Sequence, residues 1–140
     1  MSAREMIQCV WNVTTGKPEM LRTPNTIKWV GATTSAATDI WAPAAGKKFR
    51  VMKVVISPDA GLAAAGIQKI SLIEETLGDI GLNVQTYLPI AASIVHQVPI
   101  VLDLPGNGYL STTAGKKLQV TLTSACTAGL ISITVFGTEE

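Results

Sequence analysis

The chain contains very few of the residues on which catalytic and metal sites depend. Its 140 residues include one histidine, His96, and two cysteines, Cys9 and Cys126, which lie far apart and form no CxxC pair. A serine or cysteine hydrolase needs a histidine beside its nucleophile, and no Gly-x-Ser-x-Gly motif is present. A zinc site needs several clustered ligands. We therefore expect no catalytic residue, no metal and no cofactor.

Acidic side chains do not supply a catalytic pair either. Glu74 and Glu75 are the only adjacent acids inside the domain, and consecutive side chains of a strand point to opposite faces. Asp59, Asp79 and Asp103 lie near expected strand ends, close to Pro or Gly, where aspartate commonly forms turns. No calcium-loop pattern accompanies them. We expect these acids to be structural.

Charged residues are scarce as well. They make up 15% of the chain, whereas a typical soluble domain has about 25%. The 11 Lys and Arg nearly balance the 10 Asp and Glu, so no long-range field attracts nucleic acid or an anionic membrane. A weakly charged exterior is tolerated when part of it is buried against copies of the chain or a partner. The composition favours such an assembly over a monomer with a threonine-rich surface.

The chain also lacks a long apolar run. Residues 1–5 lead into a mixed segment instead of the apolar core of a signal peptide. The most apolar stretch, residues 87–102, contains two prolines and is too short to cross a bilayer. We expect no membrane partner and no export signal. Free buried thiols are the default for Cys9 and Cys126 in a chain of this size, with a disulfide or an intersubunit bond left open.

What the chain does contain is one short phrase used twice. Ala-Gly-Lys-Lys occurs at residues 45–48 and again at 114–117, and alternating apolar residues follow each copy. Glycine permits a turn, lysines stay in water and period-two apolar residues face a core, which is typical of a strand of an antiparallel sheet. Further runs of this kind are separated by turn signals, and no amphipathic helix of useful length is present. The pattern predicts an all-β fold, a jelly-roll-like antiparallel β-sandwich with about eight strands.

The expected organisation is one compact domain with two regions. Residues 1–40 form an N-terminal strand and an extended arm or loop region, and residues 41–140 form the main β-sandwich. Residues 17–26 hold two prolines and no clean period, which indicates a loop or an arm. Near Met52 and Lys53 the alternation slips, which predicts a β-bulge or burial on both sides. The expected strands lie at residues 6–13, 27–30, 48–57, 68–74, 83–90, 94–102, 118–122 and 131–135.

Two kinds of residue are candidates for an interface. Three tryptophans lie in the first third of the chain; exposed aromatic rings stack on sugars, but packing in the core or between subunits explains them more simply. A basic cluster surrounds the first Lys-Lys pair and is able to meet phosphate or an acidic partner, or to guard a sheet edge against unwanted pairing. The candidate interface residues are Trp11, Trp29, Trp41, Lys47, Lys48 and Arg50.

Three segments together resemble a known class of protein. They are residues 42–47, which end in Ala-Gly-Lys, residues 108–122, which contain the second phrase, and residues 129–137, which close on Val-Phe-Gly. They resemble small jelly-roll structural proteins of tailed bacteriophages, especially head decoration (cement) proteins and related tail or fibre modules, over residues 41–138. The resemblance implies a homotrimer on the capsid exterior that bridges shell subunits. No residue role is carried over by position.

On this basis we expect a non-enzymatic virion structural protein. It would be made in the host cytoplasm without a signal peptide, lie on the capsid exterior and stabilise the head by bridging capsid subunits. Its expected partners are copies of itself and the major capsid protein or another virion protein, with no nucleic acid. The alternative is a tail or fibre module that recognises a host glycan. A small hydrolase is disfavoured because the set of base and nucleophile is missing.

Overall fold

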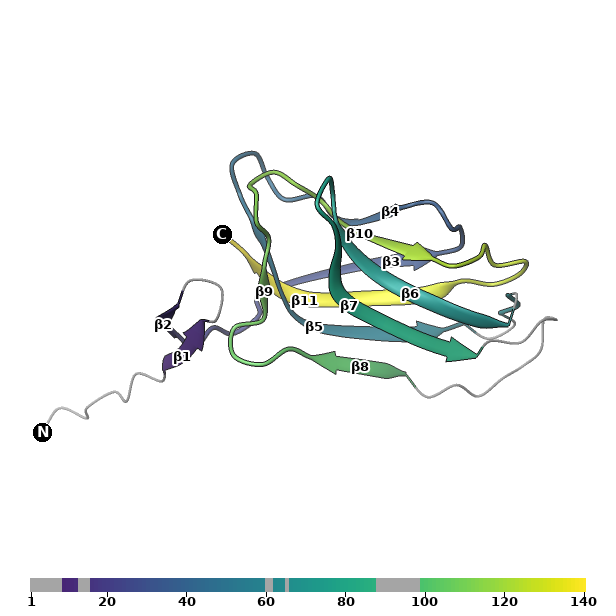
Figure 1. Cartoon of the computed structure of the whole chain (residues 1–140), viewed down its shortest axis with the longest axis horizontal. Helices are drawn as coiled ribbons and strands as arrows, with labels where there is room; N and C mark the ends of the chain where they lie inside the picture. Colours follow the sequence, from purple (N-terminus) through teal and green to yellow (C-terminus); the bar gives the residue numbers. More distant parts are fainter. Residues whose placement is uncertain (1–8, 13–15, 60–61, 65, 88–98) are drawn as a thin grey trace, which may run out of the picture.

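The computed structural model describes residues 9–12, 16–59, 62–64, 66–87 and 99–140. In these residues the chain forms two antiparallel sheets packed as a sandwich, with a separate two-stranded hairpin beside the end where the C-terminus lies (Figure 1). The predicted all-β sandwich is confirmed. The strands are β1 (Cys9–Asn12), β2 (Lys17–Met20), β3 (Thr26–Ala32), β4 (Thr38–Trp41), β5 (Phe49–Pro58), β6 (Ile67–Glu74), β7 (Gly78–Tyr87), β8 (Ile100–Asp103), β9 (Tyr109–Leu110), β10 (Leu118–Leu122) and β11 (Ile131–Glu139).

The pairing of the strands gives the sandwich the topology of a jelly roll. One sheet has the order β4-β10-β6-β7 and the other the order β3-β11-β5-β8, with the short β9 also paired to β5. Along the chain from β3, the first main strand pairs with the last (β11), β4 pairs with β10, β5 with β8 and β6 with β7. These nested antiparallel pairs describe one long hairpin rolled into two sheets, which is the arrangement of a jelly roll.

The space between the sheets is filled by the side chains of every second strand residue. In β10 and β11 every second side chain is buried, as the sequence predicts for these two segments. Trp41 and Phe49 add aromatic volume, with ring centroids 6.1 Å apart. Each fully buried large aliphatic side chain contributes about 1.5–3 kcal/mol to the hydrophobic stabilisation. The buried core residues of these strands are Leu118, Val120, Leu122, Ile131, Ile133 and Val135.

The two copies of the repeated phrase lie against each other. The N–H of Gly115 donates to the carbonyl of Lys47 at 2.7 Å, and Lys48 Nζ donates to the carbonyl of Thr112 at 2.9 Å. The first copy leads into β5 of one sheet, and the second leads into β10 of the other. The phrase therefore joins the two sheets at one end of the sandwich.

The predicted irregularity near Met52 is confirmed as a β-bulge. Opposite β5, Phe136 pairs with Lys53 but the next residue, Gly137, pairs with Val51, so Met52 has no partner in this ladder. At Gly137 the neighbouring strand approaches so closely that a Cβ would stand 1.8 Å from the carbonyl oxygen of Arg50. Only glycine fits this approach, because the clash would involve backbone atoms.

The N-terminal region differs from the expected division at residue 40. β3 and β4 are strands of the two main sheets, so the sandwich begins at Thr26. Residues 17–20, expected in a loop or an extended arm, form β2 opposite β1. Pro18 is tolerated there because a two-stranded hairpin consists only of edge strands. Parts of the strands expected at residues 6–13, 83–90 and 94–102 lie outside the described residues.

Substituting Gly137→Ala tests the close approach at the bulge. We expect it to lower the free energy of unfolding by at least about 3 kcal/mol, because two backbones must move apart. Gly31→Ala on β3 is the matched control: its Cβ would meet only the flexible Leu130 side chain, at 3.0 Å, at a cost below about 1 kcal/mol. Urea unfolding of both variants measures the difference, and equal losses would contradict the role of Gly137.

Candidate functional site

The outer face of the β4-β10-β6-β7 sheet is mostly polar, with the exposed Ile67 of β6 as an exception, and Lys117 and Lys69 each pair with an acidic side chain. Asp39 accepts hydrogen bonds from Lys117 and Gln119, each at 2.6 Å. Lys69 lies 3.7 Å from Asp79. The hydrogen bond from Lys117 is the main cause that holds the pKa of Asp39 below its usual value. This face resembles the solvated side of an ordinary antiparallel sheet.

The opposite outer face, that of the β3-β11-β5-β8 sheet, is apolar. Ile27 and Trp29 project from β3 with exposed fractions of 63% and 60%, and Val101 projects from β8 with 48% exposed. The indole nitrogen of Trp29 donates a short hydrogen bond to the hydroxyl of Ser132 on the neighbouring β11. The ring is therefore held in place although most of its surface faces solvent.

The strand register arranges the side chains of this face in rows that carry no net charge. The row through Trp29 crosses β11, β5 and β8 at Thr134, Val55 and Val101. The next row contains Lys53 and Asp103, whose charged groups lie 3.9 Å apart. These opposite charges cancel, so the described part of this face has no net charge in these rows. We call it the apolar face.

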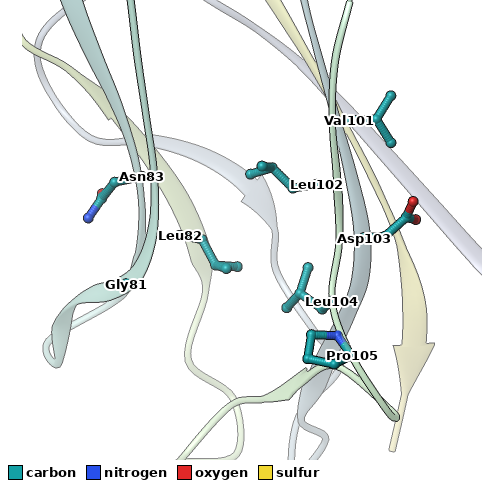
Figure 2. A pocket seen from close by; sticks show the side chains of 8 residues that line it. All are labelled: Gly81, Leu82, Asn83, Val101, Leu102, Asp103, Leu104 and Pro105. Atoms are coloured by element: carbon teal, nitrogen blue, oxygen red, sulfur yellow. The ribbon is translucent and has the colours of Figure 1, made fainter.

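An open pocket borders the apolar face at the edge formed by β7 and β8. It has a volume of about 330 Å³. Figure 2 shows Leu82, Leu102 and Leu104 pointing toward one another between the two strands, whereas Asn83 and Asp103 point away. The leucines pack against the core and are only partly buried. The sandwich is therefore less tightly closed along this edge.

A buried arginine joins four parts of the chain at the end of the sandwich near the hairpin. Arg50 is 1% exposed, and its guanidinium donates to both carboxylate oxygens of Glu140, at 2.8 and 3.2 Å. It also donates to the carbonyl of Asn107 at 3.3 Å and lies 3.6 Å from Glu19 of β2. The guanidinium is thus hydrogen-bonded and neutralised by groups inside the protein.

A buried carboxylate holds the loop that carries the second phrase. Glu74, 1% exposed, accepts hydrogen bonds from the hydroxyls of Tyr109 and Thr112, each at 2.6 Å. It also accepts from the amides of Thr112 and Thr113. Burial alone would raise the pKa of Glu74, but these donors outweigh it and the pKa is lowered. Glu75, pointing elsewhere, accepts from the Lys117 amide, so the adjacent acids form no pair.

Two of the six candidate interface residues cannot contribute to an interface of the folded chain. Arg50 is buried because it neutralises Glu140, and Trp41 is buried in the core, with its indole nitrogen donating to Glu139 at 3.1 Å. Lys48 is half-buried and bonded to a carbonyl, and Lys47 is exposed. Of the two alternatives for the basic cluster, binding of phosphate or an acidic partner is therefore not available to Arg50.

The two remaining candidates, Trp11 and Trp29, are on the surface. Sequence reasoning missed Ile27, which projects from the same face of β3 as Trp29, and Val101, which lies at the far end of the same row on β8. Local alternation suggests burial for Ile27 and Trp29, since Lys28 stands between them. Pairing with β11 decides otherwise, because it aligns Lys28 with the buried Val135 and turns Ile27 and Trp29 outward. Nothing in the sequence of residues 26–32 indicates that the side chains of Ile27 and Trp29 face outward.

The other residues considered from the sequence form no site in the described part of the chain. Cys9 is free and exposed, and Cys126 is free and half-buried, so the two are not joined. Burial raises the pKa of the Cys126 thiol. His96 lies outside the described residues. Among the residues described, no group of three or more His, Cys, Asp or Glu is placed to hold a metal ion.

Comparison with known proteins found no relative. No protein family model matches the chain, and neither a curated protein nor a solved structure was found to match it. No helix among the described residues is long and apolar enough to cross a membrane.

Replacing Glu74 with Gln tests whether the buried carboxylate is structural. A glutamine amide cannot accept all the bonds that Glu74 accepts, so we expect a loss of about 2–3 kcal/mol at pH 7. The folded-state pKa lies below the ordinary value of 4.5, so the carboxylate stabilises the fold above that value and its contribution disappears as the pH falls through the folded-state pKa. Denaturant unfolding from pH 7 to pH 3 should show the wild type and the variant converging. A constant difference would contradict this role.

Proposed function

We propose that the chain is a non-enzymatic structural protein that binds neighbouring subunits through its apolar face. The observation that carries this proposal is the difference between the two outer faces of one sandwich. Water-facing sides of antiparallel sheets are normally polar, as the side with Asp39 and Asp79 is. The exposed Trp29 and Val101 lie in one uncharged row, and the exposed Ile27 lies in the next row, where Lys53 and Asp103 neutralise each other. A face of this composition is typical of a surface that a partner buries.

We further propose that the assembly is a virion and that the chain decorates the exterior of its capsid. The support comes from the resemblance of residues 41–138 to phage head decoration proteins and from the jelly-roll topology. A closely packed sandwich is a rigid body, so it can bridge two shell subunits without deforming. Its action is mechanical, because burial of apolar area across a subunit boundary opposes separation of the subunits. A homotrimer with the major capsid protein as partner is the form that the resemblance implies.

The internal hydrogen bonds of the buried charged side chains support a non-enzymatic role. A catalytic acid or base must itself reach the substrate in order to donate a proton to it or accept a proton from it. Glu74 accepts its hydrogen bonds from neighbouring hydroxyls and amides, and Arg50 is engaged by Glu140 and Asn107. Neither lines the pocket beside β7 and β8. Both groups stabilise loops and strand ends instead.

The exposed, fixed indole of Trp29 favours a second candidate function, a tail or fibre module that stacks a host glycan on the ring. A sugar site also needs polar side chains close to the aromatic ring. Asp103 lies on β8, separated from β3 by two intervening strands, which at about 4.8 Å per strand places it roughly 14 Å across the sheet. The neighbours of Trp29 in its own row are Thr134 and aliphatic residues, so a protein partner fits this surface better.

A pair of double variants tests the proposed function. Ile27→Lys with Val101→Lys places two charges on the apolar face, and Gln85→Lys with Thr121→Lys places two on the polar face as a matched control. We expect the first pair to weaken binding to purified capsids that lack this chain by at least tenfold, because buried unpaired charges are costly. The control should bind as the wild type does. Co-sedimentation with the capsids measures both.

Two results would contradict the proposal. Unchanged capsid binding by the apolar-face variant would exclude this face as the contact. Binding of soluble glycans that is abolished by Trp29→Ala, with no capsid binding by the wild type, would favour the glycan module. Circular dichroism of each variant confirms that the β fold is retained before binding is compared.

A further inference from the structure

The N-terminal hairpin is a separate structural unit. β1 and β2 pair only with each other, and neither is part of the ladders of the two main sheets. A two-stranded hairpin alone is marginally stable in water. Its order therefore depends on its contacts with the sandwich, where residues 19–22 form hydrogen bonds and ion pairs.

The side chain of Asn107 recognises this segment through three hydrogen bonds. Its amide nitrogen donates to the carboxylate of Glu19 at 3.1 Å and to the carbonyl of Met20 at 2.8 Å. Its amide oxygen accepts the backbone N–H of Arg22 at 2.8 Å. Asn107 is 5% exposed, so without residues 19–22 its amide would lose most of its partners, at a cost of about 1–3 kcal/mol.

Opposite charges complete the recognition. Glu19 of the hairpin faces Arg50 of the sandwich at 3.6 Å, and Arg22, just after the end of β2, lies 2.6 Å from Glu140. We call Arg50, Asn107 and Glu140 the socket. The two pairs have opposite polarity, so residues 19–22 fit the socket in one direction only.

The socket is built by the sandwich and does not need the hairpin to form. Arg50 and Glu140 are joined to each other, and the backbones of Lys48 and Glu140 exchange two hydrogen bonds beyond the end of β11. Asn107 stands in a tight turn next to Gly108, which has a φ of +74° and no room for a Cβ, since the carbonyl of Val51 would be 1.9 Å away. The socket is therefore rigid and specific for its occupant.

The hairpin also presents apolar side chains that its own sandwich leaves uncovered. Trp11, Met20 and Leu21 are all about half exposed or more. The connection to β3 is short: after Arg22 come the exposed Thr23 and Pro24, and then Asn25, whose N–H already donates to Gly137. Proline keeps the preceding residue extended, which suits a hinge that lets the hairpin leave its own sandwich.

We propose that copies of this chain exchange their hairpins, so that residues 19–22 of one copy occupy the socket of another. The same hydrogen bonds and ion pairs form within a chain or between chains, so exchange costs little, and proximity to a second sandwich gives the exposed apolar side chains a surface to pack on. The occupant of the socket is thus a second copy of the chain. This exchange needs only the purified chain and does not depend on the proposed capsid role.

Complementary full-length variants test the exchange. Both are made in the Ile27→Lys, Val101→Lys background, which removes association through the apolar face. Asn107→Ala disables the socket but leaves the hairpin intact, and Glu19→Arg with Arg22→Glu disables the hairpin but leaves the socket intact. We expect each variant alone to be monomeric by light scattering and the equimolar mixture to contain a heterodimer. A mixture that contains only monomers would overturn the proposal.

Carbodiimide cross-linking gives a second readout in a variant that should fold normally. Arg22→Lys keeps the charge and puts an amine beside the carboxylate of Glu140, so cross-linking joins the two positions covalently. In an equimolar mixture of ¹⁵N-labelled and unlabelled chains under reducing conditions, exchange predicts mixed-isotope cross-linked peptides in about half of the products. Peptides of a single isotope only, with no dimer on a denaturing gel, would show that the hairpin stays on its own sandwich.

Discussion

The ion pair between Arg50 and Glu140 is the interaction on which the rest of the arrangement depends. A buried guanidinium without its carboxylate would cost several kcal/mol, so Glu140 must stay at the end of β11 and Arg50 at the start of β5. Once formed, the pair supports Asn107 on one side and Glu19 on the other. One buried charge therefore links the sandwich, the turn before β9 and the N-terminal hairpin.

A rigid sandwich with two chemically different outer faces is well suited to assembly. On the polar face, Lys117 and Asp39 form an ion pair, and both side chains remain in contact with water. On the apolar face, Trp29 and Ile27 remain exposed although the indole nitrogen is bonded to Ser132. The apolar face and the hairpin at the end of the sandwich are thus the two separate surfaces through which we propose that subunits make contact.

Much of the fold could be predicted from local patterns, because alternation and turn glycines act within a few residues. Residues 118–122 and 131–135 alternate as strands with one buried side, and the slip at Met52 is a bulge. The sites could not be predicted in the same way. Arg50 follows a Lys-Lys pair and reads as a surface residue, yet its partner Glu140 is ninety positions away.

The sequence by itself determined that this protein is an antiparallel β-sandwich with little charge to place on its surface. Only the tertiary structure decided which residues face water. Ile27 and Trp29 carry the pattern of core residues, but the register between β3 and β11 turns them outward and points Lys28 inward. Side-chain period is a local property, whereas the choice of face is made by the partner strand, which lies about a hundred residues further along the chain.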